Sequence, residues 1–286
     1  MPKGLIVYFS QGGTTARVAE AIAAGMRATE WQSTSCNMND KQPPGLDGYD
    51  LLGIGTPTYY YHAPFKVMDY VNSLPPLKGL PTFVFVLHGT YIGDTGNDIR
   101  RLLSRKGARA AGYFHSYGAD FYLPYLKEGY LFSPDHPTAE ELTKAERFGR
   151  EAAGRIGRQD YTGAKRDPPP AAIYRLERFL TNRQLANHIY SRLFRVDDKK
   201  CTSCGLCIEQ CPTGNIVEGK KGSPTFGRKC LLCLNCEMLC PEEAIISPAS
   251  WPLFRPFMIY NVRHASRDPS IEHVRVKHSQ GRTQRL

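Results

Sequence analysis

The chain of 286 residues contains nine cysteines, and eight of them lie between positions 201 and 240. These eight form two runs with the same spacing, each ending in Cys-Pro: Cys201, Cys204, Cys207 and Cys211, then Cys230, Cys233, Cys236 and Cys240. Clustered thiols in a reducing compartment indicate metal binding rather than disulfides. Zinc is commonly held by two separated Cys-x2-Cys pairs. Three cysteines at two-residue intervals, followed by Cys-Pro, instead favour iron–sulfur chemistry.

This repeated pattern resembles that of the bacterial two-cluster ferredoxins. The resemblance implies that three cysteines of each run bind one 4Fe-4S cluster and that the fourth binds the other. One cluster would be held by Cys201, Cys204, Cys207 and Cys240, and the other by Cys230, Cys233, Cys236 and Cys211. No aspartate replaces a ligand, so both clusters are expected to be complete. Cys36 stands apart from the runs and is expected to be a buried or idle thiol.

A second group of residues that could bind a ligand follows three expected strands in the N-terminal half. The first loop leads straight into a helix, whose N-terminal N–H groups, together with small hydroxyl side chains, can bind a phosphate. The other two loops carry aromatic side chains that could enclose a flat ring. The loops are Ser10-Gln11-Gly12-Gly13-Thr14-Thr15, Thr56-Pro57-Thr58-Tyr59-Tyr60-Tyr61-His62 and His88-Gly89-Thr90-Tyr91-Ile92-Gly93. Any one loop alone is also compatible with an ordinary surface turn.

Over residues 1 to about 160 the sequence resembles the flavodoxin family, whose phosphate loop is Ser/Thr-x-Ser/Thr-Gly-x-Thr. Gly12 replaces the middle hydroxyl of that motif, which would remove one side-chain contact to the FMN phosphate. The resemblance implies that residues 56–60 line one side of the isoalloxazine and residues 88–93 the other. Tyr91 is the expected stacking ring, with Tyr59 or Tyr60 as the second choice. Gly53-Ile54-Gly55 lacks the third glycine of a dinucleotide fingerprint.

Elements that would position these residues alternate along the first 160 residues. Apolar β-prone runs predict strands at 4–9, 49–55, 82–87 and 110–117, and helical periodicity follows at 14–26, 63–71, 96–105 and 138–156. The last helix opens with the capping pattern Thr138-x-x-Glu141. This alternation predicts an α/β domain, which the resemblance refines to a flavodoxin-like, doubly wound, five-stranded parallel sheet. A small α+β two-cluster ferredoxin domain would follow.

The formal net charge of +10 invites a nucleic-acid interpretation, but its distribution argues against one. Nine basic and four acidic side chains lie in residues 161–200, and seven and two lie in residues 251–286, whereas the remaining segments are close to neutral. The expected domains are 1–162 for FMN, 163–196 as a Pro-rich linker with a basic amphipathic helix, 197–250 for the clusters, and 251–286 as an aromatic, then basic tail. The tail beyond residue 261 is expected to be mobile until a partner orders it.

Taken whole, residues 1–250 resemble the flavodoxin–ferredoxin fusion proteins of anaerobic bacteria and archaea. The resemblance implies a low-potential electron carrier that passes electrons between FMN and two 4Fe-4S clusters and on to a redox partner protein. The alternative is an FMN-dependent reductase of a small organic substrate, fed by its own clusters. A third possibility is a docking subunit that binds an acidic partner through the basic helix 171–195 and the tail 261–286. No catalytic residue, nucleic-acid partner, signal peptide or membrane span is expected, which favours a cytoplasmic protein.

Overall fold

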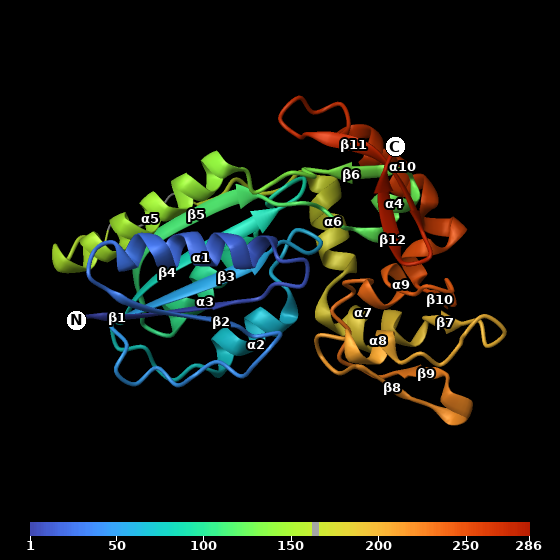
Figure 1. Ribbon diagram of the computed structural model, residues 1–286, viewed down its shortest axis with the longest axis horizontal. Helices are drawn as coiled ribbons and strands as arrows, with labels where there is room; N and C mark the ends of the chain where they lie inside the picture. The colour runs from blue at the N-terminus through green and yellow to red at the C-terminus, as the bar shows by residue number, and fades with distance from the viewer. Residues whose placement is uncertain (162–165) are drawn as a thin grey trace. The chain divides into compact units, whose positions relative to one another are not determined.

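The computed structural model describes residues 1–161 and 166–286, without the side chain of Lys221. The expected boundary between residues 162 and 163 therefore lies outside the described residues. The chain forms two compact units, one made of residues 1–119 and 135–178 and the other of residues 120–134 and 179–286. Residues 120–134 thus belong to the unit that carries the cysteine runs (Figure 1).

The first unit is built on a five-stranded parallel sheet in the order β2-β1-β3-β4-β5. Its strands are β1 (Lys3–Tyr8), β2 (Gln32–Asn37), β3 (Leu51–Pro57), β4 (Pro81–His88) and β5 (Arg109–Tyr117). This is the order of flavodoxin-like doubly wound folds, and it confirms the predicted fold class. Strand β2 was not located from the sequence, because its residues QSTSCN are mostly polar and form the sheet edge.

Helices cover both faces of this sheet because the crossovers on the two sides of β1 run in opposite directions. These helices are α1 (Thr14–Arg27), α2 (Phe65–Ser73), α3 (Thr95–Arg105) and α5 (Ala139–Gly157). The first part of α6 (Ala172–Leu180) also belongs to this unit and packs on the loops after β3 and β4. Helices α1 and α5 pack on one face over a core that includes Ile22, Phe83 and Phe148 (Figure 1). The predicted capping box is present, since Thr138 and Glu141 exchange hydrogen bonds at the start of α5.

The second unit is assembled from short elements. From residues 120–134 it takes α4 (Leu123–Lys127) and β6 (Tyr130–Phe132). Helix α7 (Arg183–His188) follows the end of α6, so the predicted basic amphipathic segment is a helix pair. The cysteine-rich part contains β7 (Arg195–Val196), α8 (Leu206–Glu209), β8 (Ile216–Glu218), β9 (Pro224–Phe226), α9 (Asn235–Met238) and β10 (Ile245–Ile246). None of the described helices is long and apolar enough to cross a membrane.

The C-terminal tail is folded, so the prediction that it is mobile beyond residue 261 is wrong. It forms α10 (Arg255–Ala265) and a hairpin of β11 (His273–Ser279) and β12 (Arg282–Arg285). Strand β11 pairs with β6, and Val276 is buried against Leu126 and Leu131. Alternation along the hairpin turns Val276 inward, while Arg275 and Lys277 are exposed. Burial of the valines therefore orders a segment whose basic composition suggested disorder.

Candidate cofactor sites

The two cysteine runs fold with the same backbone turns. In the first run, Ser203 and Gly205 have left-handed φ values of 55° and 75°. In the second, Leu232 and Leu234 occupy the matching positions with 56° and 57°. Because a left-handed conformation is costly for residues other than glycine, its recurrence at non-glycine positions marks a geometry imposed by the fold. The two runs, which repeat in sequence, thus also repeat in backbone conformation around their cysteines.

The thiols form two groups, each combining three cysteines of one run with the last cysteine of the other. Burial raises the pKa of the Cys207 thiol, and the thiolate charges of Cys204, Cys240 and Cys201 raise it further. Burial also raises the pKa of the Cys236 thiol, with additional charge effects from Cys233, Cys230 and Cys211. Such charge effects require proximity. The structure therefore brings together the same two sets of four that the ferredoxin resemblance implies.

A pocket lies among the residues of the second set. Cys211, Cys230, Cys233 and Cys236 all contribute to its wall, which is otherwise mainly apolar and includes Phe194 and Phe226. Burial, together with the neighbouring Cys233 and Cys211 thiolates, raises the pKa of Cys230 to about 12. Two buried thiols whose pKa is raised in this way, Cys230 and Cys236, fit a site where a positively charged metal centre compensates the thiolates.

Backbone N–H groups point at the sulfurs. The amide of Asn215 donates to Cys211 Sγ at 3.2 Å, and at the equivalent place in the repeat the amide of Ala244 donates to Cys240 Sγ at 3.3 Å. Leu232 donates in the same way to Cys230 Sγ. Among the described residues, no three His, Cys, Asp or Glu side chains are arranged to hold a single metal ion. Hydrogen bonds to cysteine sulfurs are a feature of iron–sulfur sites, so these amide donors fit a cluster.

The first loop lies at the carboxyl end of β1 and forms the start of α1. Gly13, at φ 84°, is the N-cap and supplies no side-chain cap, so the first turn of α1 offers its backbone N–H groups to a ligand. Ser10 and Thr15 are buried, and Ser10 Oγ accepts from the amide of Ala16 at 3.4 Å. Gly12 is exposed. These donors fit a phosphate, as the loop sequence predicts.

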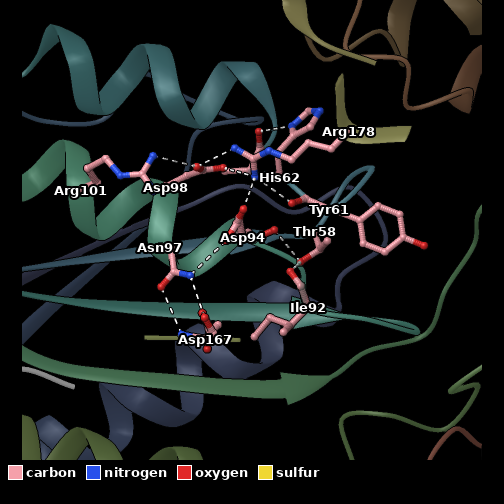
Figure 2. Close-up of polar contacts among 12 residues, drawn as sticks. Thr58, Tyr61, His62, Ile92, Asp94, Asn97, Asp98, Arg101, Asp167 and Arg178 are labelled. Carbon is pink, nitrogen blue, oxygen red and sulfur yellow. Dashed lines mark hydrogen bonds and ion pairs between the residues drawn. The ribbon is translucent and has the colours of Figure 1, made fainter. Parts of the chain in front are cut away.

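The second and third loops follow β3 and β4 at the same edge of the sheet. Tyr59 donates from its hydroxyl to Gln11 Oε1 at 2.6 Å, which connects the second loop to the first. Thr58 bonds to the carbonyl of Ile92 and to Thr95, which connects it to the third (Figure 2). All three predicted loops are therefore adjacent. Of the remaining expected residues, Thr56 and Thr90 are buried, whereas Pro57, Tyr60, Gly89 and Tyr91 are half-buried.

His88, at the end of β4, is buried beneath the third loop. Desolvation, with a smaller effect of the nearby His115, lowers the pKa of His88 to about 4. Its Nδ1 lies 3.2 Å from the carbonyl oxygen of Thr90, and its ring packs against Tyr117. His88 is thus neutral at pH 7 and supports the loop backbone.

Tyrosine packing differs from the expectation in one respect. Tyr91, the predicted stacking ring, lies against Tyr174 of α6, with ring centroids 5.3 Å apart. Tyr61 stacks on the same Tyr174 at 4.6 Å. The sequence analysis did not include Tyr174, because it lies about 80 residues from Tyr91 in a segment interpreted only as a basic amphipathic helix.

Comparison with known proteins found a family match in each of two segments of the chain. Residues 5–126 match the family model of a flavodoxin domain, and residues 200–245 match that of a 4Fe-4S dicluster domain. A ferredoxin from Streptomyces griseus is 39% identical over 49 residues, which are 16% of this chain and 47% of that protein. The chain thus spans about half the length of this curated relative.

Solved structures similar to the chain include a flavodoxin from an archaeon, with 19% identity and a TM-score of 0.42 over 54% of this chain and 99% of that one. Oxidised flavodoxin 1 from Bacillus cereus has 20% identity and a TM-score of 0.40, over 53% and 97%. The flavodiiron core from Synechocystis has 17% identity and a TM-score of 0.42, and the chain covers 36% of it.

Proposed function

We propose that this chain, a fusion of a flavodoxin domain and a ferredoxin-type dicluster domain, transfers electrons between FMN and two 4Fe-4S clusters and on to a redox partner protein. The observation that carries the proposal is the crossed grouping of eight cysteines, together with three convergent loops on a flavodoxin-like sheet in the same chain. When bound, FMN exchanges one or two electrons, whereas each cluster exchanges one.

In this proposal Cys201, Cys204, Cys207 and Cys240 hold one cluster, and Cys230, Cys233, Cys236 and Cys211 hold the other. The amides of Asn215, Leu232 and Ala244 donate to the sulfurs of Cys211, Cys230 and Cys240, and with clusters bound they would stabilise added negative charge. These donors help to set the reduction potentials, because hydrogen bonds to sulfur raise the potential of a cluster.

The flavin would occupy the edge of the sheet where the three loops meet. The amides of residues 12–15 and the hydroxyls of Ser10, Thr14 and Thr15 bind its phosphate. Residues 56–60 and 88–93 flank the isoalloxazine, and Tyr91 supplies an aromatic contact. His88 stays neutral beside the third loop and thus adds no positive charge next to a reduced flavin.

Because both cofactor domains lie in one chain, electrons can pass between flavin and clusters without a diffusional encounter of two separate proteins. Exposed basic side chains after α6 and on β11–β12, such as Arg192, Lys277 and Arg282, would dock an acidic partner, and added salt would weaken that docking. The cysteine usage favours work in a reducing, oxygen-poor cytoplasm.

The cofactor content tests this function. Protein purified without oxygen should contain about eight irons, eight sulfides and one FMN per chain. Cys36→Ser, outside both groups, serves as the matched control for any cysteine variant. Zinc in place of iron, or the lack of flavin in protein prepared with FMN in excess, would refute the proposal.

A further inference from the structure

Helix α6 follows the flavodoxin fold in sequence and packs onto two of its loops. Tyr174 is only 5% exposed, and its ring lies against both Tyr61 and Tyr91 with interplanar angles of 21° and 30°. One α6 side chain thereby contacts the loop after β3 and the loop after β4. Leu176 on the same helix is 55% exposed. The tyrosine, rather than the leucine, is the buried apolar contact of α6.

Arg178, one turn further along α6, binds the same region through polar contacts (Figure 2). Its guanidinium makes a bidentate pair with Asp98 of α3, at 3.0 Å to Oδ2 and 2.9 Å to Oδ1. Its Nη1 also donates to the backbone carbonyl of Tyr61 at 3.0 Å, and Asp94 lies 3.6 Å away. The Asp98 side chain is 7% exposed, so the carboxylate of the pair is shielded from solvent, whereas the Arg178 side chain is 28% exposed. Bidentate geometry fixes orientation as well as distance.

The loop that receives these contacts is conformationally demanding. Tyr60 and Tyr61 both have left-handed φ values, of 48° and 64°. The amide of Asp94 also donates to the Tyr61 carbonyl, at 3.0 Å. Two non-glycine residues in a row keep such a conformation only where the surrounding contacts hold them. Arg178 and the Asp94 amide supply those contacts at one oxygen.

We propose that α6 is a third wall of the flavin site and that Arg178 is the positioning residue that holds this wall in place. Through the Tyr61 carbonyl, Asp98 and the adjacent Tyr174, it fixes how the loops after β3 and β4 face each other. This spacing determines how well the isoalloxazine fits and how each of its redox states is stabilised. The inference rests on the proposed binding of FMN, and it adds a residue beyond the matched flavodoxin segment 5–126.

The test compares Arg178→Met with Arg175→Met, an exposed arginine on the same helix. Full-length protein with its clusters loaded is freed of flavin and titrated, by flavin fluorescence, with FMN and separately with riboflavin. The phosphate loop is untouched, so Arg178→Met should raise both dissociation constants at least tenfold and leave their ratio within twofold of wild type. The midpoint potential of the bound flavin should shift, and Arg178→Lys should restore affinity only in part. Arg175→Met should match wild type.

Tyr174→Leu provides a second variant that keeps apolar volume, and it decides the question if Arg178→Met does not fold. It should also weaken both flavins and shift the potential. Unchanged affinity and potential in the folded variants would overturn the inference while leaving the proposed function intact, because wild type would still bind FMN. Weakening of FMN alone would also overturn it, since that result would assign the effect to the phosphate loop. Wild-type protein that binds neither flavin would instead refute the proposed function.

Discussion

Replacing Gly93 by alanine probes the contact between the two ring-flanking loops. Gly93 has φ 59°, and an added Cβ would lie 2.6 Å from Tyr61 Cα and 2.7 Å from its carbonyl oxygen. Both are backbone atoms, so a side chain cannot rotate away to make room. The substitution must therefore push apart the loops that hold Tyr61 and Gly93.

Two effects add at this position. A left-handed alanine costs about 1–2 kcal/mol, and overpacking against fixed neighbours costs about 1–3 kcal/mol more. Gly93→Ala should thus lower the free energy of unfolding of this unit by about 2–5 kcal/mol. Gly107→Ala is the matched control, because Gly107 has φ 81° but its added Cβ would meet only Lys78 N, at 3.7 Å. It should cost about 1–2 kcal/mol, which is the backbone contribution alone.

Trp31 reports on this unit because it is part of the core between the sheet and α1. In a Trp251→Phe background it is the remaining tryptophan of the two in the chain. Denaturant unfolding followed by its fluorescence gives both free energies, and FMN titration gives the effect on binding. Gly93→Ala should also weaken FMN, whereas Gly107→Ala should not. Equal loss of stability in the two variants would refute the close approach of the loops.

Three further predictions concern the other features of the chain. Cys204→Ser and Cys233→Ser should each lower the iron content from about eight to about four per chain, whereas Cys36→Ser should leave it unchanged in an iron assay. Because His88 is held neutral with a pKa of about 4, the unfolded chain binds more protons than the native one between pH 6.5 and pH 4. The free energy of unfolding should therefore fall by up to about 3 kcal/mol as the pH is lowered through this window. His88→Gln should flatten the pH dependence of denaturant unfolding. Thr138→Ala removes the reciprocal cap of α5 and should cost about 1 kcal/mol in the same assay, with Thr143→Ala on the exposed side of α5 as the control.

Much of the sheet unit could be predicted because buried strands and helix faces produce apolar patterns in the sequence. Strand β4 is buried at all but its first residue and was located within a residue at each end, and the spacing of Thr138 and Glu141 alone predicted the capping box. Strand β2 was missed because an edge strand needs no apolar pattern. Backbone pairing with β1 holds its residues in the sheet, and a local sequence pattern does not predict such pairing.

The grouping of the cysteines could be predicted for a different reason, because their repeated spacing carries the resemblance to two-cluster ferredoxins. The folded tail was missed although its alternating valines, Val274 and Val276, carried a strand signal. The prediction of a mobile tail rested on its basic composition rather than on this alternation. The contacts of α6 with the loops could not be predicted from local sequence patterns, because the partners of Tyr174 and Arg178 lie about 80 residues earlier in the chain.

The most direct test of the account is the rate of electron exchange inside the fully loaded protein. The clusters and flavin are partly reduced under anaerobic conditions, and absorbance follows their re-equilibration after a rapid pulse of a one-electron reductant. If both cofactor domains exchange electrons within one chain, the rate constant should stay the same over a tenfold dilution. A rate that falls in proportion to the protein concentration, or clusters that are reduced while the flavin stays oxidised, would contradict the account.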